Sequence, residues 1–530
     1  MVRRWFYGVS LGLIALLVLV GVFWPPAFWG FLLVGPLVAI GLRDSLQSKS
    51  TIRRNFPLIG HLRFLFEAVR PELQQYFIEL STDAFPIERE LRSVVYQRAK
   101  GELETQPFGT QRDVYETGYE WAAHSLDDVE HLTEEPRLIV GKDSCARPYA
   151  MSRLNISAMS FGSLSPTAIR ALNGGARKGG FSHNTGEGGI SPYHLEAGGD
   201  LVWQIGTGYF GCRYDDGRFN DDLFAKNAGG ESVRMIEVKL SQGAKPGHGG
   251  VLPGAKVTPE IARIRHLPVG ITVVSPPRHS AFRTPIEMME FIARLRELSG
   301  GKPVGIKLCV GRRVELLAMC KAMLETGITP DFLTVDGGEG GTGAAPLEFS
   351  NSIGMPARDA WAFAHNALVG CGLRDRVRVI ASGKILTGFH MVRAMALGAD
   401  ACNSARGMML ALGCIQALRC NNNTCPTGVA TQNPALYRGL VVPDKAERVA
   451  RFHKATIASF LEVMHAMGVP SPDAISPEHL FRRVSASEIR SLAEIYEFLG
   501  PRVLVDGSDC PEMWRREWNA ARPDAFTMKA

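Results

Sequence analysis

The stretch GIKLCVGRRVELLAMCKAMLETGITPDFLTVDGG, residues 305–338, places two short apolar runs on either side of a longer amphipathic segment. We expect strands over residues 305–310 and 332–338 and a helix over residues 314–326, because the apolar runs are short and the segment between them has helical periodicity. A strand, a helix and a second strand in this order indicate a parallel sheet with a helical crossover. The stretch therefore predicts an α/β fold.

The same alternation extends along the chain on both sides. Further strands are expected at residues 154–162, 235–241, 270–275, 377–383 and 399–407, and further helices at residues 286–298, 358–368 and 390–397. About 300 residues of this pattern predict a (β/α)8 TIM barrel, whose usual length is ~250 residues with room for insertions. A doubly wound sheet is the alternative, but the G-x-G-x-x-G unit that opens many such sheets is missing.

The first 44 residues predict a transmembrane hairpin. Trp5–Trp24 contains no charged residue and, at ~1.5 Å per residue, is long enough to cross a ~30 Å hydrocarbon layer. A second uncharged run, Ala27–Leu42, follows a Pro-Pro break, and arginines flank only the outer ends, so both ends are expected in the cytoplasm at the inner membrane. A cleaved signal peptide is the alternative, but a second apolar run, not a small-residue cleavage site, follows the first.

Composition fits a folded protein of more than one domain. The chain has 530 residues, of which 45% are hydrophobic and 21% charged, and the first 55 residues carry most of its net charge of +6. The nearly neutral remainder gives no sign of nucleic-acid binding. After the hairpin we expect a helical lead-in over residues 45–150, with helices at 71–80 and 86–98. The barrel then occupies residues 151–470, and a small C-terminal tail, residues 471–530, contains a helix at 486–498.

Three cysteines lie within twelve residues: Cys414, Cys420 and Cys425. Three soft thiolate donors suit a three-iron cluster, and their spacing lacks the CxxC pairs of a zinc ribbon. The alternative is that they are small buried hydrophobic residues. The other seven cysteines are scattered, so no disulfide framework is expected, and a reducing compartment suits an iron-sulfur cluster.

Four motifs in one order resemble the FMN-binding synthase domain of glutamate synthases. They are TGEGG at residues 185–189, SQGAKPG at 241–247, DGGEGGTGA at 336–344 and CPTGVATQ at 425–432. The resemblance covers the chain from about residue 154 to about residue 440. It implies bound FMN and a [3Fe-4S] cluster held by the three cysteines beside the flavin.

One cofactor residue stands out from the sequence alone. Lys307 interrupts an apolar strand, where a lysine must either extend to solvent or meet an anion, and an exposed edge lysine is the alternative. The resemblance places it near the flavin ring. Other positions that match the family's FMN site are Ser160, Gln204, Gly383, Lys384, Ala405 and Arg406. The last two loops of a barrel commonly bind phosphate. Lys384 and Arg406 depart from the Gly-Gly and Gly-Ser of the family.

The glycine-rich stretch KLSQGAKPGHGG, residues 239–250, carries two lysines that suit a dicarboxylate substrate. In the resembled enzymes, the residues that match Lys239, Lys245, Glu187 and Arg265 surround 2-oxoglutarate or its imine. Lysines on a solvated loop are the alternative. The resembled loop has glutamate and glutamine where this chain has His248 and Val251. Because losing an amide hydrogen bond would weaken discrimination, a different keto acid stays open.

The resemblance implies an oxidoreductase that reduces the imine of 2-oxoglutarate and ammonia to L-glutamate. No nucleotide fold for NADPH is visible in the sequence, so an external electron donor, ferredoxin or a reductase subunit, is expected. No glutaminase domain is visible either, so ammonia is free or comes from a partner. Two alternatives stay open: a related flavoenzyme that uses methylamine or another amine and keto acid, and a non-catalytic electron-carrier module at the membrane.

Overall fold

The computed structural model describes residues 2–127, 129–507 and 509–527. The chain divides into two compact units, one up to Arg89 and the other from Glu90 onward. Each unit is described separately below.

The first unit begins with two apolar helices, α1 (Val2–Phe23) and α2 (Phe31–Leu46), joined by a 3-10 turn, η1 (Pro25–Gly30). Phe6 of α1 packs against Gly41 of α2, so the two helices lie side by side. In the described residues, the spans Val2–Phe23 and Pro25–Leu46 are long and apolar enough to cross a membrane. Helices α3 (Thr51–Asn55) and α4 (Gly60–Leu73) follow, and a π-helical turn, η2 (Gln74–Ile78), continues α4.

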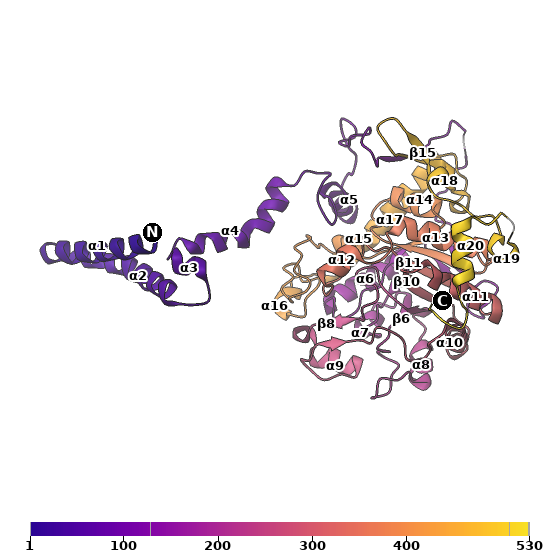
Figure 1. Ribbon diagram of the computed structural model, residues 1–530, viewed down its shortest axis with the longest axis horizontal. Helices are drawn as coiled ribbons and strands as arrows, with labels where there is room; N and C mark the ends of the chain where they lie inside the picture. The colour runs from indigo at the N-terminus through magenta and orange to yellow at the C-terminus, as the bar shows by residue number, and fades with distance from the viewer. Residues whose placement is uncertain (1, 128, 508, 528–530) are drawn as a thin grey trace. The chain divides into compact units, whose positions relative to one another are not determined.

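The second unit is built on a closed barrel of parallel strands (Figure 1). In chain order its strands are β4 (Leu154–Ile156), β5 (His183–Asn184), β6 (Leu201–Ile205), β7 (Val233–Lys239), β10 (Val304–Cys309), β11 (Phe332–Asp336), β12 (Arg378–Ser382) and β13 (Ala401–Ser404). Strand β13 pairs with β4 and closes the sheet. This confirms the predicted (β/α)8 barrel and excludes the doubly wound sheet.

Helices connect the strands and surround them. They include α6 (Pro166–Gly179), α8 (Asp221–Ala228), α10 (Pro285–Leu298), α11 (Arg313–Thr326), α13 (Ala357–Gly370), α14 (Gly388–Ala396) and α17 (Val442–Ala466). Helix α6 begins with Ser165, whose hydroxyl accepts from the N–H of Ala168, and ends at Gly180, which has a φ of +67°. Helices α10, α11, α13 and α14 confirm the helices predicted between the later strands.

One predicted barrel strand is wrong. Residues 270–275 contain β9 (Val273–Val274), which pairs antiparallel with β8 (Val251–Leu252) in a separate ribbon. The side chains of Ile271 and Val274 are 57% and 63% exposed, so the apolar run is not buried as a barrel strand would be. Strands β5 and β6 fill the barrel positions that the prediction lacked.

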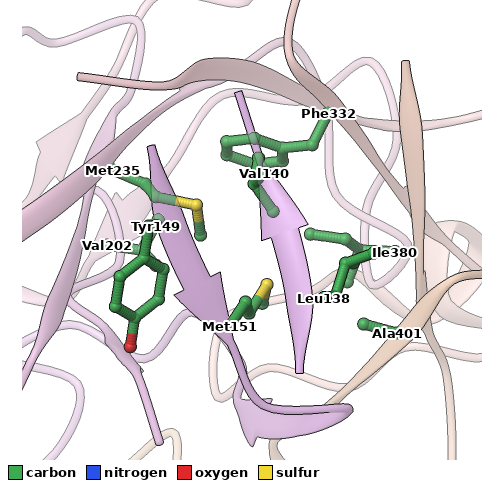
Figure 2. Close-up of a cluster of buried hydrophobic side chains, with 9 residues drawn as sticks. All are labelled: Leu138, Val140, Tyr149, Met151, Val202, Met235, Phe332, Ile380 and Ala401. Atoms are coloured by element: carbon green, nitrogen blue, oxygen red, sulfur yellow. The ribbon is translucent and has the colours of Figure 1, made fainter. Parts of the chain in front are cut away.

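An antiparallel hairpin closes one end of the barrel. Its strands are β2 (Leu138–Val140) and β3 (Tyr149–Met151). Figure 2 shows their side chains packed into a cluster with residues from five barrel strands: Val202, Met235, Phe332, Ile380 and Ala401. These five residues stand at or near the first position of their strands, so the hairpin plugs the amino end of the barrel. Part of the lead-in region therefore has a structural role.

The C-terminal tail has short helices, as predicted, and it also contributes two strands. Strands β14 (Leu480–Arg483) and β15 (Ile489–Ser491) form an antiparallel sheet with β1 (Glu120–Ala122) from the lead-in. The helix predicted over 486–498 is wrong in extent, because only α18 (Leu492–Ile495) is helical there. Helix α20 (Glu512–Ala520) brings Trp514 onto Phe363 of α13, with ring centroids 5.0 Å apart. In the lead-in, α5 (Arg89–Lys100) confirms the helix predicted at 86–98.

Candidate active site at the carboxyl end of the barrel

The barrel interior becomes polar toward the carboxyl ends of its strands. Residues two apart in a strand share a face, so the side chains two positions beyond the apolar cluster also point inward. Those side chains are Gln204, Glu237, Thr334, Ser382 and Asn403. The apolar plug thus closes one end of the barrel and a polar floor lies above it, at the end where barrel enzymes bind their substrates.

Glu237 is the centre of this floor. Its carboxylate accepts hydrogen bonds from Gln204 Nε2 at 2.6 Å, Asn184 Nδ2 at 2.8 Å and Thr334 Oγ1 at 2.7 Å. All four side chains are buried. Because each donor comes from a different strand, the network fixes the amide of Gln204 at the base of the site. Nearby in the floor, Asn403 Oδ1 is buried and has no hydrogen-bond partner in the described part of the chain.

Lys307 is buried inside the barrel and is not an exposed edge lysine. Its ammonium lies 3.3 Å from Asp336 Oδ1, at the end of the neighbouring strand. Burial alone would lower the pKa of Lys307, but the carboxylates of Asp336 and Glu237 outweigh it and raise the pKa. Lys307 is therefore a fixed positive charge at the carboxyl end of the barrel.

The four predicted substrate residues come together at this end. Lys239 Nζ donates to Glu187 Oε2 at 2.8 Å and to Gln242 Oε1 at 3.1 Å. Burial would raise the pKa of Glu187, but the charges of Lys239, Arg265 and Lys245 outweigh it and lower the pKa. One carboxylate thus faces three cations, and the cluster carries a surplus of positive charge.

Two of these cations are held with unused hydrogen-bonding capacity. Burial lowers the pKa of Lys245 to about 8, and its ammonium has a long 3.5 Å contact with the carbonyl of Ala344. Burial also lowers the pKa of Arg265 to about 10. Arg265 donates to Phe161 O at 2.8 Å, and its buried Nε has no partner among the residues described. Both groups can therefore bind an anion.

Glycines give this cluster its space. A Cβ at Gly250 would stand 2.1 Å from Glu187 Oε1, and one at Gly188 would stand 2.6 Å from a guanidinium nitrogen of Arg265. Real Cβ atoms essentially never stand under 3.0 Å from another atom, so an alanine at either position would push the charged group of Glu187 or Arg265 away. Gly188 and Gly250 therefore leave room for the close approach of these charged side chains.

The predicted cofactor residues occupy the loops at the same end. Ser160 Oγ accepts from Arg265 Nη2 at 3.3 Å, which joins the loop after β4 to the substrate cluster. The loop after β12, with Gly383 and Lys384, is tied to the end of β13, because Ser404 Oγ donates to Ile385 O at 2.6 Å.

Two more predicted cofactor residues open the next helix. Ala405 precedes α15 (Arg406–Ala411) directly. Arg406 Nη2 donates to Glu339 O at 2.8 Å, so the guanidinium turns toward the glycine-rich loop that follows β11.

The three cysteines lie in one loop, residues 413–432, which we call the cysteine loop. Burial, with smaller contributions from Cys420 and Cys425, raises the pKa of Cys414 to about 11, so the three thiols lie near one another. Burial would raise the pKa of Cys425, but hydrogen bonds from Thr427 and from backbone N–H groups lower it. Within the described ranges, no group of three or more Cys, His, Asp or Glu side chains is arranged to hold a metal ion. The donors suit an iron-sulfur cluster in kind, because each thiolate of such a cluster binds its own iron and the three sulfurs need not surround a single ion.

Lys256 connects the cysteine loop to the substrate cluster. Its buried ammonium donates to Cys420 O at 2.8 Å, Ala430 O at 3.0 Å and Ser163 O at 3.2 Å. All three ammonium donors are therefore used on loops that carry predicted site residues. Lys256 itself lies in the turn η3 (Gly254–Lys256), just before α9 (Pro259–Arg265), which ends at Arg265.

Several residues of the site were not predicted. Glu237 could have been predicted by the pattern that indicated Lys307, because it is also a charged residue inside an apolar strand. Asp336 stands inside a quoted motif, although no role was assigned to it. Asn403 and Lys256 give no comparable signal, because their importance comes from partners far away in the sequence.

Residues 103–470 match the family model described as "conserved region in glutamate synthase". The chain is 36% identical to the "glutamate synthase large subunit-like protein YerD" of Bacillus subtilis, covering 87% of this chain and 95% of that protein. It is 34% identical to the "archaeal glutamate synthase [NADPH]" of Methanocaldococcus jannaschii, covering 60% of each. Against the "glutamate synthase [NADPH] large chain" of Bacillus subtilis the identity is 36%, over 54% of this chain and 18% of that one.

Proposed function

The chain belongs to the glutamate synthase family, and from this premise we propose that it is an FMN-dependent oxidoreductase that reduces a 2-imino acid to an amino acid. The preferred substrates are 2-oxoglutarate and ammonia, and the product is L-glutamate. The observation that carries the proposal is the cluster of Glu187, Lys239, Lys245 and Arg265 at the carboxyl end of the barrel.

The charge of this cluster suits a dicarboxylate. Three cations and one carboxylate leave a surplus of two positive charges, which matches the two carboxylates of 2-oxoglutarate. Arg265, with its free Nε, and Lys239 would bind those carboxylates. Lys245, with a pKa of about 8, is protonated at neutral pH and can give its proton to the oxygen that leaves as water when ammonia condenses with the keto acid.

The polar floor fits a flavin. Lys307 offers a fixed positive charge near the ring, and Asn403 Oδ1 offers a buried acceptor that a ring N–H would satisfy. Ser160 and Gln204 would line the ring, and the phosphate would lie at the loops with Gly383, Lys384, Ala405 and Arg406. When bound and reduced, FMN supplies the hydride for the imine carbon.

The cysteine loop suits a redox role. Cys414, Cys420 and Cys425 would hold a [3Fe-4S] cluster, which would pass single electrons from an external donor such as ferredoxin or a reductase subunit. The hydrogen bonds that lower the pKa of Cys425 favour its thiolate, the form that binds iron.

We also propose that the apolar helices α1 and α2 anchor the enzyme in the cell inner membrane, with the barrel in the cytoplasm. Both candidate spans are 22 residues long, and their arginines lie near the two outer ends of the hairpin, at Arg3, Arg4 and Arg43. Cationic residues at both outer ends favour a hairpin whose ends face the cytoplasm.

An anaerobic assay tests the proposed activity. Full-length protein with chemically reduced flavin is mixed with 2-oxoglutarate or another 2-oxo acid, together with ammonia or methylamine. Flavin reoxidation with formation of glutamate from 2-oxoglutarate and ammonia is expected. Faster turnover of another pair would identify a related flavoenzyme, as the His248 and Val251 departures allow. Reoxidation by no pair would refute catalysis and favour an electron-carrier module.

A further inference from the structure

Helix α4 has one exposed apolar face. Its large apolar residues Leu62, Leu65, Phe66, Val69 and Leu73 are between 39% and 64% exposed. At 100° per residue they fall within a stripe about 100° wide, the pattern of an amphipathic helix that covers an apolar surface. Tyr76 and Phe77 of η2 continue the exposed apolar surface. We call these seven residues the apolar stripe.

The other faces of α4 are polar or already packed. Phe64 lies on the opposite side, where the guanidinium of Arg53 in α3 stacks on its ring at 4.7 Å. Arg63, which pairs with Glu67 at 3.2 Å, and Arg70 stand along one edge of the apolar stripe. Arginines at the edge of an apolar face can place their charges among lipid phosphates while the stripe lies deeper.

The start of α4 is fixed to the end of α2. Asp44, a buried residue near the end of α2, accepts from His61 at 2.8 Å and from the backbone N–H of Leu58 at 3.1 Å. Arg43 stands beside it, where the apolar sequence of α2 ends. If α2 crosses a bilayer, this contact holds α4 at the level of the lipid headgroups, with Arg53 and Arg54 of α3 close in sequence.

We propose that α4 lies in the plane of the membrane interface, with its apolar stripe buried in an anionic lipid surface. The inference rests on the proposed anchoring by α1 and α2. Helix α4 itself carries two arginines and two glutamates, so the charge that attracts acidic headgroups comes from Arg53 and Arg54 in α3 just before it, while the apolar stripe is suited to the acyl chains. The partner is therefore the lipid surface.

Site-specific photocrosslinking tests this. A benzophenone amino acid replaces Phe66, in the apolar stripe, or Phe64, on the packed face, in the full-length protein. Val69 provides a second stripe position in case the first variant misfolds. Each protein is placed in bilayers of phosphatidylcholine and phosphatidylglycerol and irradiated, and adducts are identified by mass spectrometry. The same substitution at Leu19 of α1 reports on the anchor independently.

The expected result is a several-fold higher yield of lipid adducts at Phe66 and Val69 than at Phe64, which should crosslink to α3 instead. Lipid adducts at Leu19 with none at Phe66 or Val69 would overturn the inference while leaving the anchor intact. Crosslinks from Phe66 to the barrel or to a second copy would show that the apolar stripe binds protein. No lipid adducts even at Leu19 would refute the anchor itself, and with it the inference.

Discussion

Lys245 gives the sharpest test of the site. Burial lowers its pKa from 10.5 to about 8, so about nine in ten ammonium groups are protonated at pH 7 and about one in ten at pH 9. If Lys245 supplies a proton, turnover should fall above pH 8. Lys245→Arg should turn over more slowly, because a guanidinium does not give up its proton, and the remaining turnover should lack this alkaline limb. Lys245→Met should lower turnover about a hundredfold or more, the usual contribution of a general acid.

The assay is the anaerobic reoxidation of reduced flavin by 2-oxoglutarate and ammonia between pH 6 and pH 10. The titration of ammonia affects wild type and Lys245→Arg equally, so the difference between their pH profiles reports on Lys245 alone. An alkaline limb near pH 8 that persists unchanged in Lys245→Arg would refute the assigned role. Lys245→Met should also stabilise the fold by up to about 2 kcal/mol at pH 7, because a charge held at a lowered pKa opposes folding and screening relieves only part of that cost.

Three further outcomes follow from the structure. Gly250→Ala should raise the KM for the keto acid at least tenfold, because its Cβ would displace the carboxylate of Glu187. Gly311→Ala should leave the KM unchanged, because open space surrounds Gly311. Equal effects of the two substitutions on the KM would contradict the steric argument. Lys256→Met removes three hydrogen bonds made by a buried ammonium, so hydrogen exchange in the cysteine loop should quicken and the free energy of unfolding should fall by about 1–3 kcal/mol. Unchanged exchange there would rule out this linking role. Buried histidines such as His194, whose pKa burial lowers to about 3 from 6.5, stay neutral when folded. Below pH 6.5 the unfolded chain binds more protons than the folded chain, so the free energy of unfolding should fall as the pH falls. Denaturant unfolding should show full stability above pH 6.5 and a loss of up to about 1.4 kcal/mol per pH unit for each such histidine below it. Equal stability at pH 7 and pH 5 would contradict this.

The sequence predicted the later half of the barrel well, because its strands are continuous apolar runs separated by amphipathic helices. Strands β10, β11 and β12 lie within a residue or two of their expected ranges. The prediction was wrong at residues 270–275, where an apolar run forms the exposed β8–β9 ribbon. It missed β5, because a two-residue strand made of His183 and Asn184 has neither length nor apolar character.

Individual site residues were easier to predict than the network that positions them. Lys307 was visible as a charge in an apolar strand, but its partner Asp336 becomes apparent only once the strands are adjacent. The donors to Glu237 come from strands between 33 and 97 residues away, a pairing that no local pattern encodes. Lys256 reaches Ala430 across 174 residues for the same reason. Short-range patterns predict elements, whereas long-range hydrogen bonds depend on the closure of the barrel.

The cofactor content of anaerobically purified, full-length protein tests the central claim most directly. The account predicts bound FMN, with about three irons per chain if the cysteine loop carries its cluster. The Cys420→Ser variant should lose the iron and keep the flavin. Protein that is colourless and free of both flavin and iron would contradict the account.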